Sequence, residues 1–235
     1  MYCAWIESLF IMTLLSISGF AQPANYAELY PKECRETLYA FARYESRFAE
    51  AGEPAGLSGE FVFAIVAPEI SQFSYLGNKL QTYSLKVMYV QYGKHYANFS
   101  VGLLQMQPAF IEQLDDSIRT NGYLEAQFSD YLIDRPTDRE KRVEIVNRLN
   151  DTEWQIRYLS VFCTLIHKRF AHMQFADETE KLRFYAVAYN AGLHRTEADL
   201  RQIGEKAQFP HFSRHKFKYA DVATWFWHTI TQENR

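Results

Sequence analysis

Apolar residues recur at intervals of three and four along most of the chain, which is the spacing of one face of an α-helix. The first such stripe consists of Cys34, Leu38, Phe41 and Phe48. It predicts a helix that begins at Pro31, a good first residue for a helix, and ends at Gly52. Ser58 is then a suitable N-cap for the next helix.

The same spacing continues to the end of the chain. Further helices are expected over residues 80–92, 108–114, 138–149, 153–171 and 177–190. Thr137 and Glu140 form a capping-box pattern before the helix at 138–149, and Thr152 can cap the helix at 153–171. Gly192 can end the helix at 177–190 with a left-handed residue. The tail closes with a helix whose apolar face carries Tyr219, Val222, Phe226 and Ile230. There is no repeat and no change of composition, so we expect one all-α domain.

The composition narrows the possible functions only slightly. The chain has 235 residues and a net charge of -3, which argues against nucleic acid as a partner because phosphate binding requires a basic surface. Aromatic residues make up 16% of the chain. This excess suits stacking on sugar rings, and an aromatic core accounts for it equally well.

The N-terminus resembles a secretory signal. Residues 9–17 are apolar, and Gly19 and Ala21 provide a small-x-small cleavage site. We therefore expect a signal peptide over residues 1–21, a single domain over 22–235, and an exported protein of the periplasm or cell envelope. A short buried or membrane-anchoring helix is the alternative for this segment. Cleavage leaves Cys34 and Cys163, which can either form a disulfide or, as the apolar stripe around Cys163 suggests, stay free.

Glu69 is the first candidate for chemistry. It is the only acidic residue between Phe61 and Ile111, and its neighbours in sequence are apolar. A carboxyl group in such surroundings loses solvation when it ionises, so its pKa rises toward the value that a general acid needs near neutral pH. Pro68, directly before it, predicts a kink in the helix. The alternative is an ordinary Glu on the surface of an amphipathic helix.

Three sequence blocks place Glu69 in a wider pattern. They are APEIS with Glu69, SVGLLQMQP with Gln105, and FYAVAYNAG with Tyr189 and Asn190. In this order they resemble the lytic transglycosylase family, whose SLT domain has a lysozyme-like fold. AYNAG, residues 188–192, matches the family pattern in full, and GLLQ, residues 102–105, has Leu for Met. The resemblance implies an all-α lysozyme-like domain with a Tyr-rich helical insertion between Glu69 and the GLLQ block.

One position departs from the family pattern. Ile70 follows Glu69 where the family usually has Ser, and Ser71 comes one step later. The hydroxyl that often helps to hold the catalytic Glu or the substrate is then absent, displaced, or supplied by Ser100.

The resemblance implies a peptidoglycan lytic transglycosylase, a glycan-cleaving lyase of the EC 4.2.2 class. Glu69 alone would cleave the MurNAc-β-1,4-GlcNAc bond and leave 1,6-anhydroMurNAc ends, with no metal or cofactor. The partners would be peptidoglycan glycan strands and an envelope protein complex. The implied substrate-binding residues are Ser100, Leu104, Gln105, Tyr189, Asn190 and Tyr219. Without the resemblance, Tyr189 to Gly192 would be a helix C-cap with a buried Tyr.

Three other functions fit parts of the sequence. A hydrolase of the goose-type lysozyme kind would use water in place of the C6 hydroxyl, and a non-catalytic glycan-binding envelope protein would fit the Ile70 departure. A metal enzyme would use the pairs His167/His172 or His211/His215. No HExxH motif supports the metal enzyme.

Overall fold

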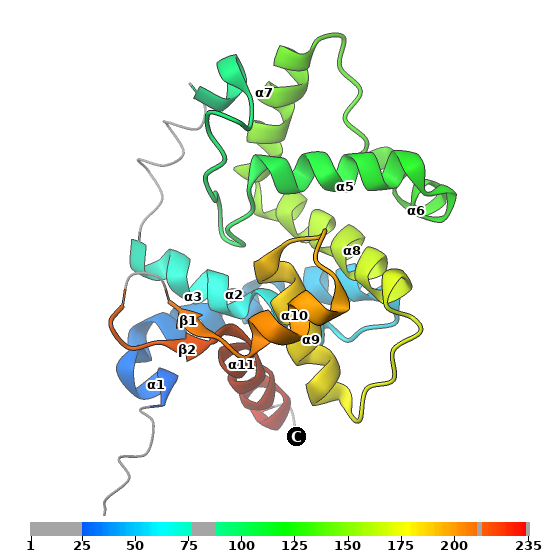
Figure 1. Ribbon diagram of the computed structural model, residues 1–235. Helices are drawn as coiled ribbons and strands as arrows, with labels where there is room; N and C mark the ends of the chain where they lie inside the picture. Colours follow the sequence, from blue (N-terminus) through cyan, green and yellow to red (C-terminus); the bar gives the residue numbers. More distant parts are fainter. Residues whose placement is uncertain (1–24, 77–87, 211–212, 234–235) are drawn as a thin grey trace, which may run out of the picture.

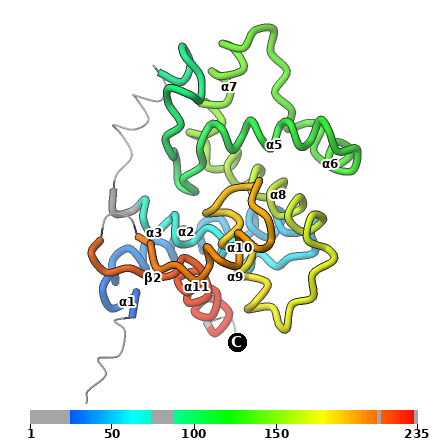
Figure 2. Tube along the Cα trace, viewed as in Figure 1, coloured from blue at the N-terminus to red at the C-terminus, as the bar shows by residue number. Residues whose placement is uncertain are grey.

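The computed structural model describes residues 25–76, 88–210 and 213–233, and these ranges are mostly helical, as expected (Figures 1 and 2). The helices are α1 (Tyr26–Leu29), α2 (Pro31–Gly52), α3 (Gly59–Leu76), α5 (Pro108–Thr120), α6 (Gly122–Phe128), α7 (Asp138–Leu149), α8 (Thr152–Arg169), α9 (Glu178–Ala191), α10 (Glu197–Gly204) and α11 (Tyr219–Glu233). Short 3-10 turns span Glu53–Ala55 and Ser129–Tyr131. Residues 88–92 are also helical, and the rest of the expected helix 80–92 lies outside the described residues.

Local capping chemistry sets most of the helix starts. Pro31 opens α2, and the Ser58 hydroxyl accepts the amide of Phe61 in the first turn of α3, as predicted. The capping box of Thr137 and Glu140 before α7 is also confirmed. For α8 the prediction was wrong by one residue, because the side chain of Asp151, not that of Thr152, accepts the first free amide.

Several short elements were not expected from the pattern. They are α1, α6, α10 and an antiparallel hairpin of β1 (Ala207–Phe209) and β2 (Phe217–Lys218). Each is too short to show a helical or strand period of its own. The hairpin packs against buried aromatic rings. The ring centroid of Phe209, which is buried, lies 5.3 Å from that of Tyr219 and 6.1 Å from that of Tyr26.

Helix α3 is the centre of the fold. It packs against α2, α9 and α11, and residues 61–67 of it are almost completely buried. The helix continues through Pro68 without ending there. In Figure 1, α5, α6 and α7 form the upper part of the molecule, α3, α9, α10 and α11 form the lower part, and α8 runs between them.

Cys34 and Cys163 are both buried and free, which excludes the disulfide between them. None of the helices in the described ranges is apolar and long enough to pass through a membrane. The expected signal peptide, residues 1–21, lies outside those ranges.

Candidate functional site

A cavity of about 320 Å³ separates the upper and lower parts of the molecule. Its wall is formed by three segments: α3, the loop over residues 98–107 with the first turns of α5 that follow it, and the end of α9. Glu69 and Gln72 come from α3, and Tyr189 and Asn190 come from α9. The cavity therefore brings together three segments that lie far apart in the sequence.

Glu69 is the only charged side chain among the described residues that line this cavity. The residues around it in α3 are buried, and Glu69 itself keeps partial exposure toward the cavity. Burial raises the pKa of Glu69 to about 7, against a weaker opposing effect of its hydrogen bond with Tyr219. A carboxyl group with this pKa holds its proton in mildly acidic solution and can release it near neutrality.

Tyr219 is buried and contacts the Glu69 side chain. Its hydroxyl donates to the backbone carbonyl of Ile65 at 3.1 Å and also hydrogen-bonds the Glu69 side chain. A phenol has one proton, so it can serve either acceptor. When Glu69 is protonated it can donate to the Tyr219 oxygen, and when Glu69 is ionised the phenol can turn its proton to the carboxylate.

The GLLQ block is a tight turn. The backbones of Val101 and Met106 exchange hydrogen bonds of 2.9 and 3.1 Å, and the four residues between them reverse the chain. Gly102 has a φ of 75°, and a Cβ built on it would lie 1.8 Å from the side-chain nitrogen of Gln155. Gln105 also has a positive φ, 51°, which is uncommon for a residue with a side chain.

The side chain of Gln155 in α8 holds this turn through hydrogen bonds. Its side-chain oxygen accepts the amide of Leu104 at 2.8 Å, and its nitrogen donates to the carbonyls of Val101 and Leu149 at 2.8 and 2.7 Å. The side chain is fully buried, and these three bonds satisfy its oxygen and both N–H groups. Sequence reasoning missed Gln155, because a single Gln on a helix carries no recognisable signal.

The turn and α9 are joined by a second contact. The hydroxyl of Tyr189 donates to the carbonyl of Leu104 at 2.7 Å, and its ring packs edge-on against Phe110 and Phe162. Gln105 donates its side-chain amide to the carbonyl of Gly102 at 2.8 Å and lines the cavity.

The end of α9 places Asn190 at the cavity. Asn190 is exposed there, one residue after the buried Tyr189. Gly192 ends α9 with a φ of 97° and a ψ of 158°, a conformation open essentially to glycine alone. The expected positive φ is confirmed, but the ψ is extended, so this is not the left-handed helical cap.

Five of the seven residues singled out from the sequence line the cavity: Glu69, Ser100, Gln105, Tyr189 and Asn190. Leu104 does not, because its side chain is fully buried and its backbone N–H and C=O are bound to Gln155 and Tyr189. Tyr219 does not line the cavity either, but it hydrogen-bonds the Glu69 side chain.

Of the two serines considered as the source of a hydroxyl near Glu69, Ser71 does not line the cavity and Ser100 does. Ser71 is buried, and its hydroxyl is bound to that of Tyr26 at 2.8 Å, away from the cavity. Ile70 is buried as well. Ser100 is the residue that places a hydroxyl in the cavity lining.

Four further carboxamides in the lining were missed: Gln72, Asn98, Gln107 and Gln113. Asn98 donates to the Gln107 side chain at 2.7 Å and accepts the amide of Ala109 at 2.9 Å, which ties the loop to the start of α5. Isolated polar residues in loops give no pattern from which to predict them. With Gln105 and Asn190 they surround Glu69 with neutral donors and acceptors.

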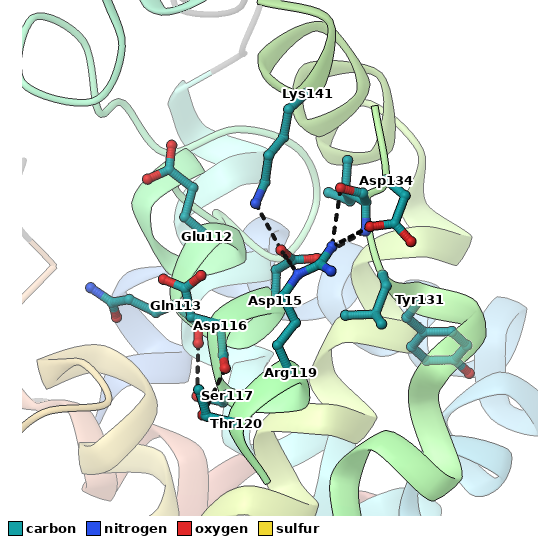
Figure 3. Close-up of polar contacts among 12 residues, drawn as sticks. Glu112, Gln113, Asp115, Asp116, Ser117, Arg119, Thr120, Tyr131, Asp134 and Lys141 are labelled. Atoms are coloured by element: carbon teal, nitrogen blue, oxygen red, sulfur yellow. Dashed lines mark hydrogen bonds and ion pairs between the residues drawn. The ribbon is translucent and has the colours of Figure 1, made fainter. Parts of the chain in front are cut away.

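Helix α5 separates the cavity from an ion-pair network. Figure 3 shows Gln113 on one side of α5 and Asp115, with Lys141 and Arg119, on the other. Glu112, the next acidic residue after Glu69, does not line the cavity. It accepts the hydroxyl of Tyr89 and pairs with Lys94, both at 2.7 Å. No second carboxylate in the described lining therefore stands beside Glu69.

The described residues hold no group of three His, Cys, Asp or Glu side chains that could bind a metal ion. Comparison of the chain with protein-family models, with curated proteins and with solved structures finds no match.

Proposed function

We propose that the chain is a peptidoglycan lytic transglycosylase that cleaves the MurNAc-β-1,4-GlcNAc bond with Glu69 as its one catalytic carboxyl. The observation that carries the proposal is a single carboxyl group, with a pKa of about 7, in a cavity where the other polar side chains of the described lining are neutral. The resemblance of the three sequence blocks to the SLT domain supports the same lysozyme-like fold and function.

The chemistry of the lining suits an uncharged sugar chain. Carboxamides such as Asn98, Gln105 and Asn190 offer both donors and acceptors, which match hydroxyl and N-acetyl groups. Phe110 and the ring of Tyr189 supply apolar area for a sugar face. A phosphate or nucleotide would find no cation among the described lining residues.

In the proposed reaction, the Glu69 carboxyl donates its proton to the glycosidic oxygen, and the bond from that oxygen to C1 of MurNAc breaks. The substrate's N-acetyl group stabilises the positive charge at C1. The Glu69 carboxylate then takes the proton of the C6 hydroxyl, whose oxygen bonds to C1 and closes the 1,6-anhydro ring. Glu69 ends protonated, as it began, so the step consumes no co-reactant.

The substrate sets the proposed location. Peptidoglycan lies outside the cytoplasmic membrane, so we propose export to the periplasm or cell envelope through the segment 1–21. A complex of envelope proteins is a proposed partner on the same ground.

The test is digestion of purified sacculi, with mass analysis of the products. We expect 1,6-anhydro ends from the wild type and a fall in turnover of about 100-fold or more for Glu69→Gln, since the general acid is lost. Glu60→Gln, in the first turn of the same helix, is the matched control and should keep full turnover.

Other products would assign the cavity differently. Reducing ends from the wild type would indicate the goose-type hydrolase. Strands that are bound but not cleaved, equally by wild type and Glu69→Gln, would indicate a glycan-binding protein without catalysis.

A further inference from the structure

A second cavity, of about 350 Å³, adjoins the GLLQ turn. It is lined by Gly102 and Leu103, the first two residues of the turn, whereas Gln105 at the end of the turn lines the cavity of Glu69. Its other walls come from α2, from Phe73 near the end of α3, and from the segment that links α7 to α8.

The second cavity has a positive charge that no described residue neutralises. Arg43 is its only charged lining residue, and no carboxylate lines it. Within the described ranges Arg43 makes no ion pair, while Arg47 on the same helix is paired with both Glu50 and Glu153. The Arg43 guanidinium lies over the ring of Tyr44, 5.3 Å from its centroid, which leaves its N–H groups available to a ligand.

The rest of the lining is mainly apolar. Tyr39 is 73% exposed, and Tyr44, Phe73 and Leu103 are partly exposed. At Tyr44 the backbone leaves helical values, with a φ of -117° and a ψ of 17°, so α2 bends in the wall of this cavity. Such a surface accepts a ligand that combines small apolar groups with a carboxylate.

The linings of the two cavities include neighbouring residues. Phe73 follows Glu69 by one turn of α3, a distance of about 6 Å along the helix axis. They also share the GLLQ turn, which the buried Gln155 holds in place. A group attached to a chain that occupies the first cavity can therefore reach the second.

Building on the proposed function, we infer that the second cavity binds the carboxylate-bearing peptide stem attached to the glycan substrate. The stem carboxylate pairs with Arg43, and its alanine methyl groups pack against Tyr39 and Leu103. The side-chain amide of Asn150, which also lines the cavity, is placed to bind a peptide group of the stem. Sugar and stem are thus recognised by opposite ends of a single turn.

The inference is tested by binding, without turnover. The probe strands are glycan strands with intact stems and strands from the same sacculi whose stems an amidase has removed. The full chain with Glu69→Gln should bind the stem-bearing strands about fivefold more tightly, the size of effect expected for one exposed charge-assisted contact. Adding Arg43→Gln should abolish that preference and leave the affinity for stem-free strands unchanged.

Arg35→Gln is the matched control, because Arg35 is an exposed arginine on the same helix that does not line the cavity. It should keep the preference. If the Arg43 variant keeps it as well, or if the parent shows none, the stem site is wrong while the catalytic proposal stands.

If neither kind of strand binds, the proposed function itself fails. Titration with a free stem peptide then decides the cavity by itself. Binding that is lost on amidation of the peptide carboxylates and on Arg43→Gln supports the site, and no binding overturns it.

Discussion

At the scale of single residues, the main feature is a carboxyl group that the fold keeps partly out of water. Glu69 belongs to α3, whose residues 61–67 are almost completely buried, and it lines the cavity. Two neighbouring titratable groups are the phenols of Tyr189 and Tyr219; burial raises the pKa of both, and proximity to Glu69 raises it further. None of these groups offers a positive charge that would favour the ionised carboxylate.

Stability should therefore fall as the pH rises. The pKa of Glu69 is about 7 in the folded protein and 4.5 for a free Glu side chain, so the folded state holds the proton more tightly. Between pH 4.5 and 7 the unfolded chain releases this proton while the folded state keeps it, so stability falls across this range and the loss is complete above pH 7. We expect Glu69→Gln to gain about 3 kcal/mol over the wild type between pH 4 and pH 8, measured by urea unfolding.

The control for this measurement is Glu60→Gln, which removes a carboxyl group from the first turn of the same helix, outside the cavity lining. A constant difference for Glu69→Gln across the same range would show that the carboxyl is not destabilised by burial. Because the proposed mechanism needs the protonated acid, turnover of sacculi should also decline as the pH rises through about 7.

At the scale of elements, the site depends on a four-residue turn held by a helix outside the cavity. The turn contains two positive φ angles, at Gly102 and Gln105, and the buried side chain of Leu104 packs it into the core. Gln155 of α8 adds two hydrogen bonds to the turn, at Leu104 and Val101, and a third to the carbonyl of Leu149. The position of Gln105 therefore depends on α8, a helix that lies far from it in the sequence.

Gln155→Met should be strongly destabilising. Methionine has a similar shape but cannot pair with the amide of Leu104 or the carbonyls of Val101 and Leu149, which would stay buried and unsatisfied. We expect a loss of about 3 kcal/mol in the free energy of unfolding, read from chemical denaturation. Gln202→Met, at an exposed position of α10, should change it by less than about 0.5 kcal/mol. An effect of Gln155→Met as small as that of the control would contradict the role of Gln155.

At the scale of the whole molecule, a buried carboxylate in the upper part binds groups from several of its segments. Asp115 of α5 is almost fully buried and binds Lys141 of α7 at 2.8 Å, Arg119 at 3.0 Å, and the amide of Ile133 at 2.9 Å (Figure 3). Burial alone would raise the pKa of Asp115, but these partners outweigh it and hold the pKa below the usual value. Asp115 thus joins α5 to α7 and to the segment before it.

We expect Asp115→Asn to lower the free energy of unfolding by about 3 kcal/mol at pH 7, since it leaves two cations without their buried partner. The lowered pKa means that this contribution is present above the unfolded value of 3.8 and is lost as the pH falls below it. The deficit of the variant should therefore shrink in acid. Asp116→Asn, an exposed neighbour without an ion pair in the described ranges, is the control. A deficit that stays constant down to pH 2 would show that the network does not depend on the ionised carboxylate.

These two carboxyl groups act in opposite directions on the pH dependence of the molecule. Asp115 loses its contribution in acid, and Glu69 imposes its cost as the pH rises above 4.5. Their sum favours maximum stability in mildly acidic solution, within the window between the two titrations.

Much of this architecture follows from local patterns. The stripe from Cys34 to Phe48 predicts α2, and the capping box at Thr137 predicts the start of α7, because both signals depend on residues within a few positions of one another. The short elements, such as the β1–β2 hairpin, are stabilised by contacts with distant rings, so their own residues carry too little information to predict them.

The sequence by itself determined that the chain is helical, where most helices begin, and that Glu69 is a carboxyl group with apolar neighbours. These properties are local, since they depend on side-chain period, capping and composition. Only the tertiary structure decided what shares a cavity with Glu69. In that structure Gln72, Asn98 and Gln113 line the cavity, whereas Leu104 and Ser71 do not. Gln155 holds the GLLQ turn by hydrogen bonding. The physical reason is that burial and hydrogen bonding are properties of neighbours in space, which the order of residues along the chain does not specify.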